Sequence, residues 1–148
     1  MSEIDRYNPE QEVSKDRKVS KSPYKVLDAP NLSEDFYLNL LDWSSTNLLA
    51  VGLERAVYIW SAEKGSVTKL VEVAGDDMIT SVNWHGRGSH IAVGTHRGIT
   101  QVWDVNHEHL VQEYDGHHGR VSAIAWCDEV MSTGSRDHSI LHRDIRSR

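Results

Sequence analysis

The chain contains 148 residues with a formal net charge of −6, five tryptophans and a single cysteine. One cysteine cannot form an internal disulfide, and no apolar run reaches the roughly 18 residues that a membrane span needs. The negative charge does not favour nucleic-acid binding, which usually requires a basic surface. These features predict a soluble intracellular binding protein, with neither nucleic acid nor a membrane as its partner.

Residues 1–35 differ in composition from the rest of the chain. They hold all three prolines. They also contain five basic residues between positions 15 and 25, a stretch in which Asp16 is the only acidic residue. A segment with so little apolar content cannot offset the entropy lost on ordering. We therefore expect a disordered or extended basic arm over residues 1–35, followed by a folded domain over residues 36–148.

The folded part repeats. Trp43, Trp84 and Trp126 each end a strand-like apolar run, at intervals of about 41–42 residues. A second register of glycines and a third register of tryptophans keep nearly the same period. Trp103-Asp104 closes one repeat and Gly116-His117 precedes the next. A period of about 40–45 residues with these endings is typical of WD repeats, each of which forms one four-stranded propeller blade.

The repeats predict an all-β fold, a WD-repeat β-propeller with blades at 37–73, 79–114 and 120–145. The expected strands are 37–43, 48–53, 56–62 and 67–73; 79–85, 90–96, 99–105 and 109–114; and 120–126, 130–136 and 139–145. Propellers close with about four to eight blades, and these residues supply about two and a half. We therefore expect an incomplete propeller, either a fragment, a truncated product or a partial array that a second chain completes.

The third repeat carries a candidate polar network of structural character. His117, Ser135 and Asp137 stand where WD repeats join a histidine, a hydroxyl and a turn aspartate to a strand tryptophan. Arg143 takes the place of that tryptophan, so the network is expected to be incomplete.

The residues give no sign of an enzyme, a cofactor or a metal site. The nine histidines include only two close pairs, His117-His118 and His107 with His109, and neither has the spacing of a zinc site. Cys127 directly follows a strand tryptophan, which favours a packing role over a catalytic one.

Several segments together resemble the Fizzy/Fizzy-related family of WD-repeat coactivators of the anaphase-promoting complex. They are Lys25–Pro30, Asp35–Ser45, Val93–His96, Arg120–Trp126, Ser132–Asp137 and Arg143–Arg146. The resemblance extends from about residue 18 to 148 and implies the first part of a propeller of about seven blades. It further implies a substrate-recognition and activator subunit of this ubiquitin ligase, located in the nucleus and cytoplasm. Its partners would be ligase subunits and substrates that carry degradation motifs.

The same resemblance implies site residues. The groove for the destruction-box motif lies between the first and last blades, and its first-blade wall would contain Leu27, Asp28, Tyr58, Trp60 and Val67. Asp28 could pair with the arginine of that motif, while the apolar side chains could surround its leucine. Because the opposite wall belongs to the last blade, binding by this chain alone should be weak or nil.

Three further features follow from the family. Asp35 matches a residue of the top-face site for the Lys-Glu-Asn motif. A degenerate ligase-docking box is formed by Asp5, Arg6, Tyr7 and Pro9. Ser22, which precedes a proline, suits a proline-directed kinase. Two alternatives stay open: a generic WD-repeat scaffold, and a non-functional or interfering short product.

Overall fold

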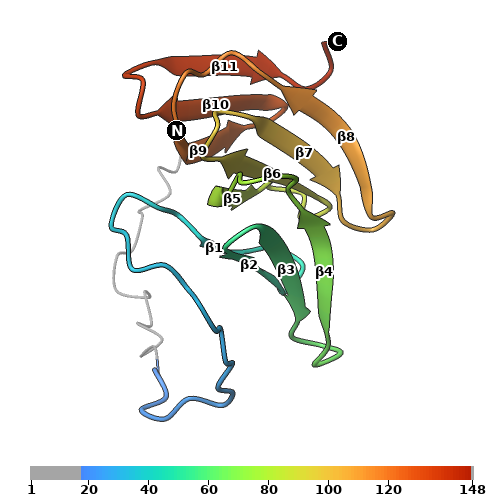
Figure 1. Cartoon of the computed structure of the whole chain (residues 1–148). Helices are drawn as coiled ribbons and strands as arrows, with labels where there is room; N and C mark the ends of the chain where they lie inside the picture. Colours follow the sequence, from blue (N-terminus) through green and yellow to red (C-terminus); the bar gives the residue numbers. More distant parts are fainter. Residues whose placement is uncertain (1–17, 148) are drawn as a thin grey trace, which may run out of the picture.

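The computed structural model describes residues 18–147, and eleven strands in three antiparallel sheets lie within them (Figure 1). The first sheet contains β1 (Leu41–Trp43), β2 (Leu48–Leu53), β3 (Ala56–Ser61) and β4 (Val67–Glu72). The second contains β5 (Ile79–Trp84), β6 (His90–Thr95), β7 (Thr100–Asp104) and β8 (His109–Tyr114). The third contains β9 (Val121–Cys127), β10 (Val130–Ser135) and β11 (Ile140–Asp144). Each sheet is a meander in which consecutive strands pair.

The sheets are arranged as successive blades. The strand β5 contacts both β1 and β9, so the first strand of each sheet lies toward a common axis, while β4 and β8 lie at the periphery (Figure 1). This arrangement confirms the predicted all-β, partial propeller fold.

The main difference from the expected strands lies at the first one. A strand was expected over 37–43, but β1 comprises only Leu41–Trp43, and residues 18–38 contain neither helix nor strand. Asn39 instead forms an isolated parallel bridge with Ser81 of the second sheet. Its backbone accepts a hydrogen bond from Val82 N at 2.8 Å and donates one to Thr80 O at 3.1 Å. The start of the predicted strand therefore connects two sheets instead of extending one. Among residues 18–147 no helix is long and apolar enough to cross a membrane.

Tryptophans on the inner strands fasten each sheet to the one before it. The indole Nε1–H of Trp84 donates to the backbone oxygen of Asp42 at 3.1 Å. One repeat later, Trp126 Nε1–H donates to the backbone oxygen of Asn83 at 3.3 Å. In both cases the acceptor immediately precedes the inner-strand tryptophan of the preceding sheet. The same contact therefore sets the relation between both pairs of neighbouring sheets.

Glycines in the second strand of each blade allow the next sheet to approach. A Cβ atom on Gly52 would lie 2.8 Å from Ile79 Cγ2, and one on Gly94 would lie 2.9 Å from Val121 Cβ and would also clash with Ser81 Oγ of its own sheet. At the equivalent Gly134 the nearest atom would be Ala123 Cβ of the same sheet, at an ordinary 3.5 Å. The absence of a side chain is therefore required where a described sheet follows, at Gly52 and Gly94.

The apolar core fills the two spaces between the sheets. The larger cluster lies between the first and second sheets and contains Val57, Ile59, Ile79, Val93 and other buried side chains. The smaller cluster is centred on Met131, which is fully buried between the second and third sheets. Packing between sheets thus provides most of the buried apolar surface.

We predict that Gly52→Ala destabilises the protein by about 1–3 kcal/mol, because the added methyl group overpacks the contact with buried Ile79. The equivalent Gly134→Ala is the matched control and should change the free energy of unfolding by less than about 0.5 kcal/mol. Urea denaturation of both variants measures the difference. Equal effects of the two substitutions would contradict this account of inter-sheet packing.

Candidate functional site

An apolar surface covers the side of the first sheet that is turned away from the second. Cross-strand pairing places two rows of side chains on this side, which we call the outer face of the first sheet. The residues of the outer face are Leu41, Val51, Tyr58 and Lys69 in one row and Trp43, Leu49, Trp60 and Val67 in the other, so that Lys69 is its one charged member. Leu41, Trp43 and Val67 are 54%, 47% and 62% exposed, which is unusual for large apolar side chains in one group.

Two tryptophans form the centre of the outer face. Trp60 is only 5% exposed and packs edge-to-face against Trp43, with ring centroids 5.9 Å apart. Val67 is paired with Trp60 across the neighbouring strand β4. The structure therefore brings together three of the predicted destruction-box residues, Tyr58, Trp60 and Val67, on one surface.

The other two predicted destruction-box residues lie apart from this surface. Leu27 and Asp28 belong to the segment before β1, which loops away from the first sheet (Figure 1). Leu27 is 39% exposed and Asp28 is exposed. Within residues 18–147 no hydrogen bond or ion pair joins Asp28 to another side chain. The five candidates are therefore not assembled as one site in this conformation.

Asp35 lies away from the outer face and contacts Arg120, which immediately precedes β9 of the third sheet. Its Oδ2 accepts a hydrogen bond from Arg120 Nη1 at 2.9 Å, and its Oδ1 accepts one from the backbone N–H of Tyr37 at 2.9 Å. The Tyr37 N–H and, to a smaller extent, the Arg120 guanidinium hold the pKa of Asp35 below its usual value. Arg120 also lies over the Tyr37 ring, 5.7 Å from its centroid. Asp35 thus stays ionised and already has one cationic partner.

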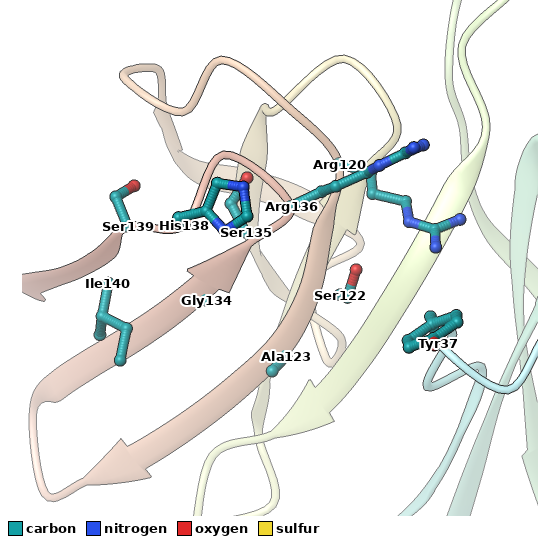
Figure 2. Close-up of a pocket in the computed structure, with 10 residues that line it drawn as sticks. All are labelled: Tyr37, Arg120, Ser122, Ala123, Gly134, Ser135, Arg136, His138, Ser139 and Ile140. Atoms are coloured by element: carbon teal, nitrogen blue, oxygen red, sulfur yellow. The ribbon is translucent and has the colours of Figure 1, made fainter.

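A pocket of about 670 Å³ opens beside this ion pair (Figure 2). Figure 2 shows Tyr37 and Arg120 on one side of the pocket and Ser139 and Ile140 on the other. The remaining lining residues are Ser122, Ala123, Gly134, Ser135, Arg136 and His138. Arg120 Nε is buried and has no hydrogen-bond partner among the described residues. The guanidinium groups of Arg120 and Arg136 both line this pocket and could bind a carboxylate there. Neither arginine was identified as a site residue from the sequence.

The polar network of the third sheet differs from the expected one. His117 Nε2 contacts Thr133 Oγ1 at 2.8 Å, and His117 Nδ1 contacts Asp137 Oδ2 at 3.2 Å. The hydroxyls next to the imidazole are those of Thr133 and Ser139, at 3.0 Å for the latter. Ser135 accepts a hydrogen bond from the backbone N–H of Asp137 at 3.2 Å and donates to the backbone oxygen of Gly119 at 2.9 Å, so it joins the turn aspartate, but its predicted place beside the histidine was wrong.

The expectation that this network is incomplete was also wrong. Arg143 Nη1 donates to Thr133 Oγ1 at 3.0 Å, which supplies the donor expected from a tryptophan. Arg143 Nη2 donates to the backbone oxygen of Asp115, and the guanidinium lies 5.2 Å from the Tyr114 ring centroid. With the proton of His117 on Nδ1, each hydrogen bond in the series has a donor and an acceptor. Arg143 donates to Thr133, Thr133 donates to His117 Nε2, and His117 Nδ1–H donates to Asp137. The network is therefore closed by a cation at one end and an anion at the other.

Comparisons with known proteins agree with this architecture. A family model described as "Anaphase-promoting complex subunit 4 WD40 domain" matches residues 41–129, more than half of the chain. The chain is 53% identical over 135 residues to Protein FIZZY-RELATED 1 of Arabidopsis thaliana, a match that covers 91% of this chain and 28% of that protein. It is 48% identical over 131 residues to Anaphase-promoting complex subunit cdh1 of Dictyostelium discoideum, covering 88% of this chain and 17% of that protein.

The chain belongs to the Fizzy-related family of WD-repeat proteins. A chain in the crystal structure of the mitotic checkpoint complex has a TM-score of 0.84 and 42% identity to it, covering 88% of this chain and 41% of that one. The Fizzy-related chain thus spans less than a third of the length of the two curated relatives above. The resemblance noted from the sequence is confirmed.

The remaining predicted residues of the Fizzy-related chain stay predictions. The ligase-docking box of Asp5, Arg6, Tyr7 and Pro9 lies outside the described residues. Ser22 is exposed, and its backbone oxygen accepts a hydrogen bond from Ser20 Oγ at 2.8 Å. Its position in an exposed segment without helix or strand is compatible with access by a kinase.

We predict that Thr133→Val destabilises the Fizzy-related chain by about 1–3 kcal/mol. Valine has the shape of threonine but would leave His117 Nε2 and Arg143 Nη1 without their buried partner. Ser132→Ala on the same strand is the control, because the Ser132 hydroxyl contacts only exposed His142. Urea denaturation compares the two. A loss no larger for Thr133→Val than for the control would rule out an energetic role of the network.

The ionised form of Asp137 should make the stability dependent on pH. Hydrogen bonds from the Ser139 hydroxyl, the backbone N–H of His118 and other donors hold the pKa of Asp137 far below its usual value. The resulting stabilisation is complete above the unfolded-state pKa of about 4 and is lost as the pH falls toward the folded-state pKa. We expect the difference in unfolding free energy between wild type and Asp137→Asn to shrink between about pH 7 and about pH 3. Denaturation curves across this range test it, and a constant difference would refute it.

Proposed function

We propose that this protein acts in a substrate-recognition and activator subunit of the anaphase-promoting complex ubiquitin ligase, present in the nucleus and cytoplasm, and that it is not itself an enzyme. The proposal is supported by relatives whose names are Fizzy-related proteins and a subunit of that complex. The observation that carries it on this chain is the exposure of the apolar side chains of Leu41, Trp43 and Val67 on the outer face.

The outer face suits the leucine of a destruction-box motif. Trp60 forms a rigid floor because its ring is packed against Trp43, and exposed Val67 borders it. An aliphatic side chain placed on such a floor gains burial without the cost of ordering flexible groups. In this proposal a second β-sheet covers the other side of the peptide, supplied by the last blade of the family's propeller or by a second chain.

Acidic residues of the segment before β1 would bind the cationic groups of degradation motifs. Asp28 is exposed and has no cation bound to it within residues 18–147, so it is available for an arginine. Its segment must then move toward the outer face. Asp35 would form an ion pair with the lysine of the Lys-Glu-Asn motif in addition to its pair with Arg120. Arg120 and Arg136, which line the adjacent pocket, would bind the glutamate of the motif. The docking box would make the contact with the ligase, and phosphorylation of Ser22 would regulate that contact.

The two alternatives predict different behaviour of the same surface. A generic scaffold would bind partners without regard to an arginine and a leucine in their sequence. A non-functional short product would have the outer face but bind no degradation motif at all. A peptide titration can therefore distinguish each of these alternatives from the proposed function.

We expect a destruction-box peptide to bind the outer face weakly, because the described residues supply only one wall of the proposed groove. In an NMR titration the indole signals of Trp43 and Trp60 should shift, whereas those of Trp84 and Trp126 should not. The latter two indoles are engaged between sheets and act as internal controls. Asp28→Ala should weaken binding by about tenfold, and Glu34→Ala, an equally exposed acid of the same segment, should leave it unchanged.

A second peptide with alanine in place of both the arginine and the leucine completes the design. Equal shifts with this peptide would favour the scaffold. Shifts of Trp84 and Trp126 alone, or no shift at millimolar peptide, would reject the proposed site.

A further inference from the structure

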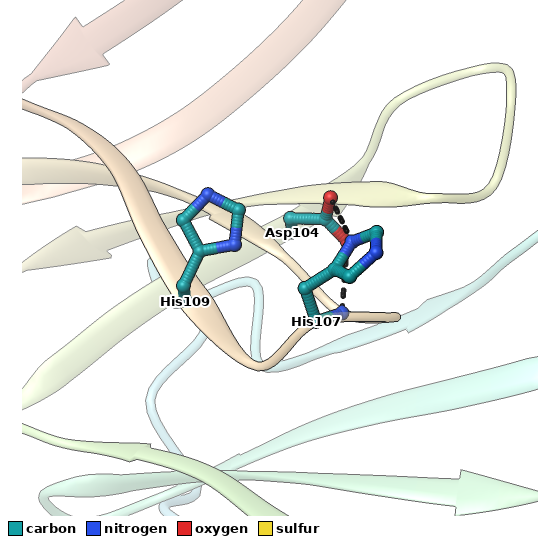
Figure 3. A group of neighbouring side chains, drawn as sticks. All are labelled: Asp104, His107 and His109. Atoms are coloured by element: carbon teal, nitrogen blue, oxygen red, sulfur yellow. Dashed lines mark hydrogen bonds and ion pairs between the residues drawn. The ribbon is translucent and has the colours of Figure 1, made fainter.

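The hairpin that connects β7 and β8 gathers three metal-binding side chains that the proposed function does not use. Asp104 ends β7, His109 begins β8, and the two residues are direct cross-strand partners. His107 lies in the turn between them. One ligand atom from each of the three residues lies within 4.8 Å of the other two. Figure 3 shows the Asp104 carboxylate between the two imidazole rings.

The carboxylate is fixed before any ligand arrives. Asp104 Oδ1 accepts hydrogen bonds from the backbone N–H groups of Asn106 and His107, at 2.9 and 3.2 Å. Its Oδ2 is thereby directed at His107 Nδ1, 2.9 Å away. The Asp104 side chain is only 13% exposed, whereas that of His107 is 75% exposed. One ligand is therefore preorganised, and the two imidazoles can rotate in solvent without loss of packing.

The third sheet provides an internal contrast at the equivalent turn. Asp144 corresponds to Asp104, but its carboxylate is engaged by Arg146, with Nε on Oδ1 at 2.9 Å and Nη2 on Oδ2 at 2.5 Å. These bonds from Arg146 lower the pKa of Asp144 to about 2. The carboxylate is satisfied by a guanidinium there, whereas in the second sheet it faces two imidazoles.

We propose that Asp104, His107 and His109 form a surface site for a divalent transition-metal ion, with Zn²⁺ as the reference ion. Two imidazole nitrogens and one carboxylate oxygen are the donors that Zn²⁺ accepts, and a fourth position stays open to water. Tetrahedral bonds of about 2.0–2.1 Å require donors about 3.3–3.4 Å apart. His107 Nδ1 and Asp104 Oδ2, which are 2.9 Å apart, must therefore separate slightly, and no pair of the three donors needs to approach by more than about 1.5 Å. On binding, the ion replaces the His107–Asp104 hydrogen bond. Hard ions such as Mg²⁺ and Ca²⁺ are disfavoured by the imidazoles.

The test is a calorimetric titration of the full chain, freed of metal with a chelator, with ZnCl₂. We expect one Zn²⁺ per chain, and about tenfold or greater weakening in each of His107→Ala, His109→Ala and Asp104→Asn. Two controls should bind as the wild type does: His96→Ala, which removes an exposed histidine elsewhere, and Asp144→Asn, which alters the equivalent turn.

An NMR experiment on the histidine rings makes the assignment independent of the variants' folding. In wild-type protein, Zn²⁺ should shift the ring signals of His107 and His109 and leave that of buried His117 in place. No saturable binding up to about 1 mM Zn²⁺ would overturn the proposal, as would equal affinity in His109→Ala and His96→Ala. Shifts confined to other histidines would overturn it as well.

Discussion

The hydrogen bond from an inner-strand indole to a carbonyl of the preceding sheet is the contact on which this architecture depends. Trp84 and Trp126 make it with Asp42 and Asn83, and each acceptor lies at the same place in its repeat. The contact is directional, unlike apolar burial, so it fixes the register of one sheet on the next. Trp43 occupies the same position but donates to Asn47 Oδ1 of its own sheet at a long 3.4 Å.

The exposed position of Trp43 leaves the outer face accessible to the ligand proposed above. In the two internal contacts the indole is engaged by a neighbouring sheet, whereas in the first sheet it packs against Trp60 and stays 47% exposed. An aromatic surface shaped for a neighbouring sheet also fits an extended peptide, since both offer backbone carbonyls and alternating side chains. In the proposed function, packing and recognition would therefore use the same side chains on this sheet.

The period of the sequence was enough to predict the three sheets, because tryptophans and glycines recur wherever neighbouring sheets meet. It was not enough for contacts made by individual long side chains. Arg143 was expected to break the network, yet its guanidinium reaches Thr133 from the position of a tryptophan. The Asp35–Arg120 pair joins residues 85 positions apart, and no local pattern indicates it. The pair His107 and His109 was rejected as a zinc site from its spacing, and Asp104 was not considered because it joins them only through the pairing of β7 with β8.

The two open faces of the described sheets present different side chains. The outer face of the first sheet presents large side chains around Trp43, while the far side of the third sheet presents Ala123 and Gly134 at the border of the pocket. The two internal interfaces combine the same elements, since Gly52 receives Ile79 and Gly94 receives Val121. Gly134 offers the same recess, where an added Cβ would meet only its own sheet. Gly134 therefore occupies the glycine position of the repeating interface without a following sheet among the described residues to fill its recess.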